Sequence, residues 1–549
     1  MRASLFCGVM FWVCHGGAVA YGEEFFVGEG SEYTTINAAL SAAQDGDVVT
    51  VRTGRYEETI ETQGPGITIR SAGDGEVLVT QAGYVLRVRH ERTTIDGVVL
   101  DGQYSDRDGV QVRGEAHQLL LRNVEVRHIG NDCVDLGSQH DVTIDGCLIH
   151  HCLRATRENC SAPDCREDAH GISGAAVRNL TVRNTEIHTV SGDAIQVDPG
   201  RNEPGWSGLV IEGCRLWSQP LPESVGGFAR GVVTAENALD TKTSNDVIEP
   251  AEVTIRDTHV WGFRGGLIGN MAAFNLKENV RVHLDRVTVN DSEIALRLRG
   301  RTNSRPRGAQ VSLSNTVIYD VDTAIRYEDG IEVVQIDSTT IGLNVNRVFD
   351  DVSEGGRVEG RNILVLADTL PAQLEGPSHL AVDATCFVNA AESDYHLTEG
   401  CPAIDRGQTL NENVYDRSGT FRPQGAGWEI GAFEFCAGEC DGAPTADGGA
   451  DASGARDAGP DARLTTLDAG RPMDAMGTPL AEDSMAPRSD ALALRGDTAP
   501  ESEARAEHEP DRASGGCSSV GTGRFGGVFG LLIIISLASR PRRRRRAAR

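Results

Sequence analysis

One short segment pairs two residue types that can do chemistry. Residues 235–244, AENALDTKTS, read as a β-strand, and Asp240 and Lys242 stand two positions apart. Side chains two residues apart on a strand share a face. A lysine with nearby cations can act as a base, and a carboxylate can act as acid, base or metal ligand. The segment predicts a reactive face wherever neighbouring strands add matching side chains.

A repeated pair, a small residue followed by an apolar one, supplies those neighbours. The pairs are Gly109-Val110, Cys133-Val134, Gly171-Ile172, Ala194-Ile195, Ala238-Leu239, Ala273-Phe274, Ala295-Leu296 and Ala324-Ile325. If the apolar residue points inward, the residues on either side of it point outward. The next outward position then reads Gln111, Asp135, Ser173, Gln196, Asp240, Asn275, Arg297 and Arg326. Two residues further it reads Arg113, Gly137, Ala175, Asp198, Lys242, Lys277, Arg299 and Glu328.

This alignment predicts a basic patch, because adjacent strands lie about 4.8 Å apart. Stacked cations destabilise a sheet unless anions compensate them, so we expect an anionic ligand there. Lys242 is the candidate base and Lys277 the alternative, while Arg297 and Arg299 are candidates to neutralise a substrate carboxylate or leaving group. The predicted substrate-binding residues are Gln196, Asn275, His170, Trp217 and Trp261.

An acidic half is predicted beside the basic one. A second outward column, two residues before the apolar one, reads Asp108, Asp132, His170, Asp193 and Asn237. Ca²⁺ prefers six to eight oxygen ligands, and clustered carboxylates suit it. The predicted calcium ligands are Asp135, Asp168, Asp198 and Asp240. The alternative is that these side chains cap strands or bind backbone groups.

Two insertions are placed to form walls of this face. They are residues 155–168 and residues 218–236, and the second ends just before the Asp240 strand. The aromatic residues in or near these coils either stack on sugar rings or pack in the core. They are Trp206, Trp217, Trp261 and Phe228.

The ends of the chain predict export. Residues 1–20 form a secretory signal, with one early arginine, an apolar stretch and Ala18-Val19-Ala20. Residues 441–515 are rich in Ala, Asp and Gly, which predicts a disordered linker. Residues 516–549 combine Gly-Cys, a short apolar run and an arginine cluster. That tail resembles the C-terminal sorting signals of myxobacterial-type exported proteins, which implies cell-surface or outer-membrane attachment; a plain transmembrane tail anchor is the alternative.

The net charge limits the classes of binding partner, and the cysteine content predicts disulfide bonds. The formal net charge of −28 argues against nucleic acid as a partner. Thirteen cysteines in an exported chain predict disulfides. Close spacing favours Cys160–Cys165, Cys386–Cys401 and Cys436–Cys440, and leaves open the pairing of Cys133, Cys147, Cys152 and Cys214.

Short strands separated by Gly, Asn and Asp fill the region between. Segments such as VTIDGCLIHHC, LTVRNTEIHTVSG and VTIRDTHVWG recur about every 22–45 residues, which is typical of a solenoid. YTTINAALSAAQDGDVVTV, residues 33–51, reads as a helix capped by Thr34 or Thr35 and followed by a strand. We therefore expect an all-β solenoid with an N-terminal helical cap.

These segments resemble right-handed parallel β-helix proteins of the pectate-lyase-like superfamily, over most of residues 24–436. The resemblance implies a right-handed parallel β-helix over 24–380 and a C-terminal β segment, 381–440, that completes it. It implies an acidic polysaccharide as partner and β-elimination from a uronate as the reaction, and we expect a monomer.

Two other functions remain open from the sequence. A hydrolase of the polygalacturonase type is echoed by DRDG (106–109), NDCV (131–134), AHGIS (169–173) and LDTK (239–242). Three positions depart from that family's motifs, namely Asn131, Ala169 and Asp240. Its two carboxylates would be Asp108 and Asp132. The third reading is a non-catalytic surface protein that binds or adheres to carbohydrate.

Overall fold

The computed structural model describes residues 22–155, 167–200, 205–242, 249–300, 307–328, 330–331, 333–352, 356–412, 414–438 and 440. The chain divides into two units, Met1–Arg463 and Leu464–Arg549, and every described residue belongs to the first. The predicted signal (1–20), linker (441–515), sorting tail (516–549) and Cys160–Cys165 bridge lie outside the described residues. Within the described ranges, no helix combines the length and apolarity needed to cross a bilayer.

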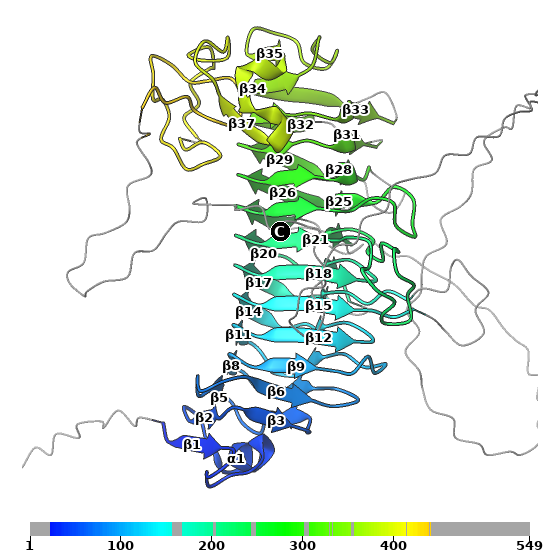
Figure 1. Ribbon diagram of the computed structural model, residues 1–549, viewed down its shortest axis with the longest axis vertical. Helices are drawn as coiled ribbons and strands as arrows, with labels where there is room; N and C mark the ends of the chain where they lie inside the picture. The colour runs from blue at the N-terminus through cyan, green and yellow to red at the C-terminus, as the bar shows by residue number, and fades with distance from the viewer. Residues whose placement is uncertain are drawn as a thin grey trace, which may run out of the picture. The chain divides into compact units, whose positions relative to one another are not determined.

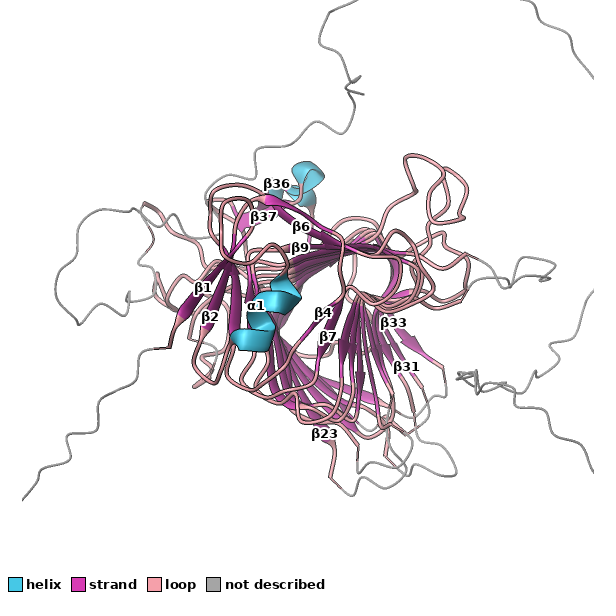
Figure 2. Ribbon diagram, turned by 90° about the horizontal axis from the view of Figure 1, so that it is seen from below, coloured by secondary structure: helices cyan, strands magenta, loops and turns pink. Residues whose placement is uncertain are grey.

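Parallel strands stack into a right-handed β-helix, which confirms the predicted fold class. Each coil runs through three strands, and equivalent strands of successive coils pair in parallel (Figure 1). The view along the axis shows the strands of successive coils arranged around a common interior (Figure 2). Apolar side chains fill that interior as one continuous core. We call the three stacks sheets 1, 2 and 3, in the order in which each coil enters them.

The bounds of the strands follow the coil order. Sheet 1 holds β1 (Glu24–Val27), β2 (Val48–Val51), β5 (Thr68–Ser71), β8 (Thr94–Asp96), β11 (Leu120–Arg122), β14 (His140–Asp145), β17 (Arg178–Arg183), β20 (Leu209–Glu212), β23 (Ala251–Arg256), β26 (Val280–Asp285) and β29 (Gln310–Ser314). Sheet 2 holds β3 (Gly54–Tyr56), β6 (Val77–Thr80), β9 (Val99–Asp101), β12 (Glu125–Ile129), β15 (Leu148–Cys152), β18 (Glu186–Val190), β21 (Arg215–Trp217), β24 (His259–Trp261), β27 (Thr288–Asn290), β30 (Val317–Ile318) and β35 (His379–Val382). Two long strands, β32 (Val333–Ile341) and β34 (Arg357–Leu366), run through both sheets.

Sheet 3 is separate and carries the predicted site. Its 11 strands are β4 (Ile60–Glu61), β7 (Leu86–Val88), β10 (Val110–Val112), β13 (Val134–Leu136), β16 (Ile172–Ala175), β19 (Ile195–Asp198), β22 (Leu239–Thr241), β25 (Ala272–Leu276), β28 (Ser292–Leu298), β31 (Val321–Tyr327) and β33 (Val345–Asp351).

The register of sheet 3 is the one predicted from the sequence. The eight predicted inward residues form one column, in which each is paired with the next: Val110, Val134, Ile172, Ile195, Leu239, Phe274, Leu296 and Ile325. All eight are buried. The small residue before each leaves space where the chain turns into the sheet; a Cβ on Gly171, for example, would lie 2.5 Å from the carbonyl oxygen of Ala194.

A bend in the left-handed backbone region joins sheet 1 to sheet 2 in most coils. Glycine and asparagine dominate it because they enter that region at little steric cost. The residues at the bend are Gly97, Asn123, Gly146, Asn184, Gly213, Asp257, Arg286, Asn315, Ser338 and Asn362. Several asparagines also donate to the carboxylate of the coil before, as Asn184 Nδ2 does to Asp145 Oδ1 at 3.0 Å.

The N-terminal end is closed by helix α1 (Ile36–Ala42), as predicted (Figure 2). Its N-cap is Thr35, whose hydroxyl accepts the Ala38 N–H at 3.3 Å. Glu58 accepts the free backbone N–H of Ile36 at 2.7 Å. The buried face, which includes Leu40, covers the first coil and shields its apolar interior from water.

The cysteines divide into bridges and free thiols. Two predicted bridges, Cys386–Cys401 and Cys436–Cys440, are confirmed. The pairing left open from the sequence is Cys133–Cys152, which links the start of β13 to the end of β15. Cys147 and Cys214 are free and buried, so they behave as small core residues.

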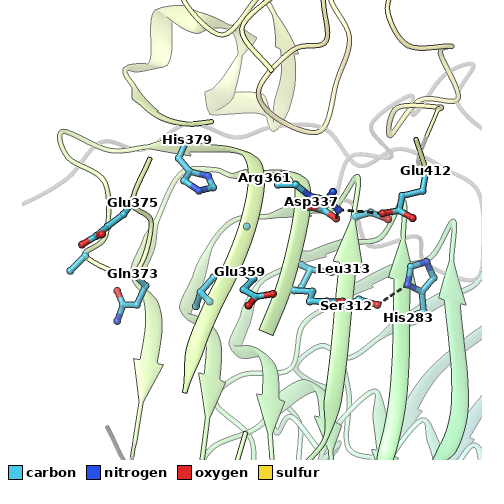
Figure 3. Close-up of a pocket in the computed structure, with 15 residues that line it drawn as sticks. His283, Ser312, Leu313, Asp337, Glu359, Arg361, Gln373, Glu375, His379 and Glu412 are labelled. Atoms are coloured by element: carbon cyan, nitrogen blue, oxygen red, sulfur yellow. Dashed lines mark hydrogen bonds and ion pairs between the residues drawn. The ribbon is translucent and has the colours of Figure 1, made fainter. Parts of the chain in front are cut away.

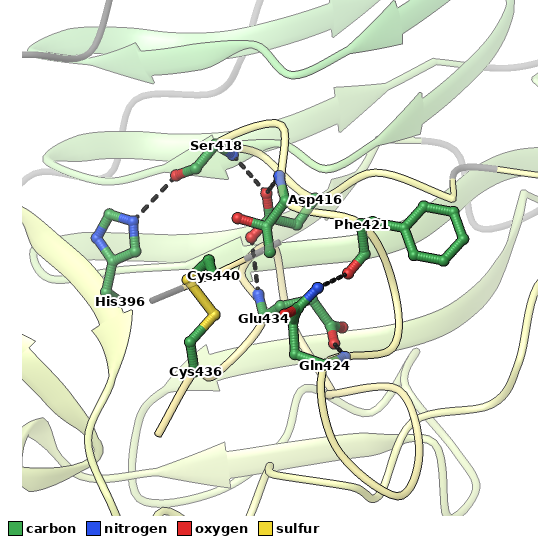
Figure 4. The surroundings of a disulfide bond; sticks show 9 residues. His396, Asp416, Ser418, Phe421, Gln424, Glu434, Cys436 and Cys440 are labelled. Carbon is green, nitrogen blue, oxygen red and sulfur yellow. Dashed lines mark hydrogen bonds between the residues drawn. A yellow bond between two sulfur atoms is a disulfide. The ribbon is translucent and has the colours of Figure 1, made fainter. Parts of the chain in front are cut away.

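The C-terminal segment does not extend the solenoid as predicted. It forms an antiparallel pair, β36 (Phe387–Asn389) and β37 (Asp394–Leu397), with short 3₁₀ turns at Ala384–Cys386 and Ala390–Glu392. Its apolar residues pack on outward-facing Val317 and Leu364 of sheet 2. Figure 4 shows the network around its last disulfide, in which Asp416 accepts the Glu434 N–H at 2.9 Å.

A buried arginine fastens this segment to the solenoid. The Arg422 guanidinium donates to Glu434 Oε1 at 2.8 Å, and both side chains are fully buried. It also donates to Asn315 Oδ1, at the bend between β29 and β30, at 3.1 Å. Burial and the neighbouring Glu434 raise the pKa of Glu429 to about 9. The buried Arg422–Glu434 ion pair is stable only while both partners are present, because a single buried charge is costly.

We expect Arg422→Leu to destabilise the C-terminal segment by about 3–5 kcal/mol, because it leaves the Glu434 carboxylate buried without its cation. Urea denaturation followed by the fluorescence of Trp428, over which the guanidinium lies, measures this loss. The exposed Arg406→Leu change is the matched control and should stay within about 0.5 kcal/mol of the unsubstituted protein. Equal effects of the two changes would contradict the account.

Candidate active site

The outward columns of sheet 3 bring the predicted residues together. In the first column Gln196, Asp240, Asn275 and Arg297 are successive neighbours on four paired strands. Asp198 pairs with Ala175, and the second column continues through Lys242, Lys277 and Arg299 just beyond the strand ends. The patch predicted from the sequence is therefore continuous across neighbouring coils.

Three aspartates gather at the other end of the patch, and we call them the acidic half: Asp108, Asp132 and Asp135. Asp108 is buried, and its Oδ1 accepts Asn131 Nδ2 at 2.6 Å. The Arg113 guanidinium forms an ion pair with the Asp135 carboxylate. Burial and the Asp108 charge nevertheless raise the pKa of Asp135 to about 7. A proton is therefore retained in this cluster in the neutral range.

Asp132 is held from the next coil. Its Oδ1 accepts the backbone N–H of His170 at 2.8 Å. Burial, followed by the charges of Asp135 and Asp108, raises the pKa of Asp132 well above its usual range. A carboxyl group that keeps its proton near neutrality is suited to act as a general acid.

The ring of His170 is fixed in one tautomer. The Asp193 backbone N–H donates to its Nδ1 at 2.8 Å, so the neutral ring carries its proton on Nε2. Burial lowers the pKa of His170 to about 4, which keeps the ring neutral. Gly192 permits this contact, since a Cβ there would lie 2.6 Å from Nδ1. His170 is thus a positioned hydrogen-bond donor.

Asp193 and Asn237 continue the same column behind His170. The Asp193 carboxylate accepts both the backbone and the side-chain N–H of Asn237, at 3.1 and 2.8 Å. Asn237 Oδ1 in turn accepts the Ala272 N–H at 3.0 Å. Burial and the Asp240 charge raise the pKa of Asp193 to about 7. This network links the acidic half to the Asp240 strand.

We call the remaining part of the patch, Lys242, Lys277, Arg297 and Arg299, the basic half. Carboxylates of the protein lie among these cations. Lys277 Nζ lies 2.9 Å from Asp240 Oδ2, and Asn275 Nδ2 donates to Asp240 Oδ1 at 3.3 Å. Lys242 Nζ donates to Gln196 Oε1 instead of to a carboxylate. Among the contacts of the described residues, the Lys277 ammonium is engaged by a carboxylate and that of Lys242 by an amide oxygen. Of the two candidate bases, Lys242 is therefore the less tightly held.

The arginines are paired in a similar way. Arg299 Nε lies 2.8 Å from Glu328 Oε2, and Arg297 lies 3.5 Å from the other oxygen of the same carboxylate. Burial and the neighbouring Arg299 lower the pKa of Arg297. The stretch holds more cations, Lys242, Lys277, Arg297, Arg299 and Arg326, than paired carboxylates, Asp240, Glu328 and Asp350. Carboxylates of the protein therefore compensate part of this charge, and the anionic ligand expected there stays a prediction.

Sheet 1 shows how this protein normally arranges charge. One outward column there alternates in sign from coil to coil: Arg70, Asp96, Arg122, Asp145, Arg183, Glu212, Arg256 and Asp285. Neighbours in it form ion pairs, such as Arg183–Asp145 at 2.8 Å. Sheet 3 instead separates an acidic half from a basic half. That separation distinguishes it from a surface charged only for solubility or stability.

The predicted calcium ligands do not converge on one ion. Asp135 and Asp240 occupy the same column but are three coils apart, with Ser173 and Gln196 between them. Asp198 Oδ1 accepts the Gly200 N–H at 2.7 Å. Across the described part of the chain, no group of three or more His, Cys, Asp or Glu side chains is arranged to hold a metal. These four residues therefore do not fit a shared calcium site.

Two predicted substrate-binding residues lie on a different sheet. Trp217 and Trp261 face outward from sheet 2 and stack on each other, with ring centroids 5.8 Å apart. His188 covers the other face of Trp217 at 4.1 Å. These rings cannot contribute to the Lys242 patch, and the faces of Trp217 are already covered. Trp206 is buried, and its Nε1 donates to the carbonyl oxygen of Lys242, which supports the end of β22.

The second predicted wall is present beside the site. Leu221 and Phe228, from the segment 218–236, are buried together with Leu153, just after β15. Phe228 therefore packs in a small core and does not present its ring to a ligand. Of the first predicted wall, residues 156–166 lie outside the described residues, while Glu167 forms an ion pair with Arg154.

Several residues of the site were missed or misjudged from the sequence. Asn131 and Arg113 hold the acidic half, although the sequence showed Asn131 only as a departure from a motif and Arg113 only as a member of the second outward column. Arg154 reaches Asn131 Oδ1 at 2.9 Å from the preceding sheet, a contact that no strand alignment predicts. Asp108 and Asp132 were noted as an alternative pair, and only their shared position beside Asp135 reveals their importance.

Comparisons with known proteins agree with the fold. Residues 86–248 match the model of the right handed beta helix region family. Similar solved structures include pectate lyase Pel9A, with TM-score 0.41, 14% identity, and 76% of this chain and 97% of that chain covered. An alginate lyase from Paenibacillus sp. str. FPU-7 has TM-score 0.35 and 16% identity, with 59% of this chain and 94% of that chain covered. A polygalacturonase from Erwinia carotovora ssp. carotovora has TM-score 0.35 and 10% identity, with 63% of this chain and 98% of that chain covered.

Likeness at this level concerns the fold alone. No curated protein sequence matches the chain. The assignment of an activity must therefore come from the side chains of sheet 3.

We expect His170 to titrate near pH 4, well below an ordinary histidine, and to carry its neutral proton on Nε2. Nitrogen-detected NMR of histidine-labelled protein measures both properties, and His170→Gln identifies the signal. A His170 titration between pH 6 and 7, or a neutral ring protonated on Nδ1, would overturn the proposed tautomer.

Proposed function

We propose that this protein hydrolyses glycosidic bonds in an acidic polysaccharide, and that the acidic half performs the chemistry. The observation that carries the proposal is the gathering of Asp108, Asp132 and Asp135 on adjacent coils, where burial raises the pKa of two of them. Paired carboxyl groups in different protonation states are what glycoside hydrolysis requires. The hydrolase interpretation is therefore stronger than the echoed motifs alone made it.

In the proposed reaction Asp132 is the general acid. It protonates the glycosidic oxygen as the bond to the anomeric carbon breaks. The Asp108–Asp135 pair takes a proton from the attacking water, whose oxygen forms the new bond to that carbon. The Nε2–H of His170 is placed to donate to a substrate hydroxyl.

The basic half is proposed to select the substrate. Its excess of positive charge on a strongly acidic protein favours a sugar chain that carries carboxylates. Arg297 Nε is buried and has no hydrogen-bond partner in the described residues, so it retains an unused donor. Five strand spacings of about 4.8 Å separate Arg297 from Asp135, so a uronate chain bound there would extend over several sugar residues to the acidic half.

Elimination by Lys242 is the second candidate. The supporting observation is that Lys242 bonds to an amide oxygen of Gln196, while Lys277 is paired with Asp240. In that reaction Lys242 removes the C5 proton of a uronate, the C4–O bond breaks, and a C4–C5 double bond forms, while the departing oxygen takes a proton from water and leaves as a hydroxyl. The predicted calcium ligands do not converge on one position among the described residues, so neither reaction is assigned a calcium ion.

Reducing ends and ultraviolet absorbance, followed together on polygalacturonate and alginate, test the proposal. Hydrolysis produces reducing ends without the absorbance of a double bond. We expect Asp132→Asn to lower the rate by about 10²–10⁴-fold, because the acid is removed. Asp257→Asn, at a bend away from sheet 3, is the matched control and should retain the rate.

New absorbance that is lost in Lys242→Ala would contradict hydrolysis and support elimination. Polysaccharide binding without either signal would indicate a non-catalytic, adhesive protein.

The two reactions also differ in pH dependence. A general acid must be protonated, so the rate of hydrolysis should fall as the pH rises through the pKa of Asp132, which burial and the charges of Asp135 and Asp108 raise well above its usual range. The loss should approach tenfold per pH unit. A lysine base must be deprotonated, so elimination should become faster over the same range. A kcat that increases steadily from pH 6 to 9 would contradict the hydrolase proposal.

A further inference from the structure

A large pocket opens on sheet 1, well separated in sequence from the acidic half. Its volume is about 950 Å³, at the upper end of the range typical of ligand sites. The floor comes from β26, β29, β32 and β34, and the walls come from residues 372–379 and Glu412. We call it the sheet 1 pocket. Figure 3 shows Gln373 and Glu375 on one side of it and Glu412 and His283 on the other.

The pocket begins where the alternating charges of sheet 1 stop. Asp285 is followed in that column by Ser314, and only then by Asp337 and Arg361. The outward positions two residues earlier on the same four strands are His283, Ser312, Gln335 and Glu359. The floor therefore changes from ion pairs to hydroxyl and amide groups. Such groups both donate and accept hydrogen bonds, which matches the hydroxyls of a sugar.

The charge of the lining is negative. Asp337, Glu359, Glu375 and Glu412 line it with a single guanidinium, that of Arg361. Arg361 is bound to both oxygens of Asp337, at 2.7 and 2.5 Å, and its guanidinium also lies 3.4 Å from Glu412 Oε1. Glu359 pairs with Arg357 at 2.8 Å, so the four carboxylates still outnumber the two cations that contact them. The electrostatics of this pocket therefore oppose the uronates proposed for sheet 3 and favour a cation.

His379 provides an independent sign of a missing partner. It lines the pocket and is 7% exposed, yet its Nδ1 has no hydrogen-bond partner in the described residues. Burial lowers the pKa of His379, so the ring is neutral and one of its nitrogens is an acceptor. The ring approaches β34 at Gly360, where a Cβ would lie 3.1 Å from it. A buried polar atom without a partner is rare, and a ligand donor would satisfy it.

We propose that the sheet 1 pocket binds a saccharide that carries free amino groups. The sugar hydroxyls bond to Ser312, Ser314 and Gln335, and the ammonium groups lie against the carboxylates of Glu375 and Glu412. The pocket would give the protein a second saccharide contact of opposite charge preference. This proposal does not depend on the reaction at sheet 3.

A saccharide fits this pocket better than a peptide strand does. The first half of β34, residues 357–361, pairs only with β32 in the described structure and so offers a free strand edge. A peptide that added to this edge would need pockets for alternate side chains. The lining is dominated by polar and charged side chains, among them Glu359 and Gln373, and has few apolar ones.

Calorimetric titration of the full chain with the tetramer of β-1,4-linked glucosamine tests the proposal. The salt concentration is kept at 0.3 M so that loose attraction to the acidic surface is screened. We expect saturable binding to one site, and at least about tenfold weaker binding for Glu375→Gln and for Glu412→Gln. The matched control, Glu252→Gln on β23 of the same sheet, should leave affinity unchanged.

Three probes identify the chemistry of the ligand. The fully acetylated tetramer lacks the positive charges and should bind at least about tenfold more weakly. Tetralysine carries the charges without the sugar and should bind weakly, while oligogalacturonate should not compete. Absence of binding by the glucosamine tetramer, or binding that survives both substitutions, would overturn the proposal. Equally tight binding of tetralysine would replace the saccharide with a basic peptide.

Asp132→Asn separates this site from the proposed hydrolysis. It should leave the affinity for the glucosamine tetramer unchanged, because it changes only sheet 3. An altered affinity would contradict the independence of the two sites.

Discussion

The stacking of coils in parallel register governs every charged surface of this molecule. Each outward side chain lies about 4.8 Å from its counterparts in the coils before and after it. A like charge in that position is costly and an opposite charge is favourable. Sheet 1 satisfies this constraint by alternating Arg with Asp or Glu through successive coils, as at Arg122, Asp145 and Arg183. Any surface that departs from alternation needs another explanation.

Sheet 3 departs from it by gathering carboxyl groups at one end and cations at the other. The electrostatic cost is reduced within the protein, since Asp240 and Glu328 are paired with cations, and burial and neighbouring charges raise the pKa of Asp132. What remains is a face with proton-transfer groups beside an excess of positive charge. An acidic sugar chain lying along the column would complement both halves. The sheet 1 pocket departs in the other direction, with hydroxyl and amide groups followed by carboxylates that outnumber the arginines paired with them.

The sequence predicted the fold and the register because both depend on local spacing. A small residue before each inward residue, as in Ala238-Leu239, was enough to align eight coils. The pairing Cys133–Cys152 was not predicted, because it depends on how far β15 lies from the start of β13. Trp217 and Trp261 were misplaced for a related reason: the sequence does not show which of the three sheets an outward residue occupies. The ion pairs of Lys277 and Arg299 lie between coils, so their compensation appeared only in three dimensions. The closing segment around Arg422 packs outside the solenoid and has no repeat to predict it.

The most direct test of the central claim is the structure of the Asp132→Asn protein with a bound acidic oligosaccharide. The account predicts that the sugar chain lies along sheet 3, with its carboxylates against Lys242 and Arg297 and a glycosidic oxygen beside residue 132. A chain bound instead along the His188–Trp217 stack of sheet 2, or in the sheet 1 pocket, would contradict the account.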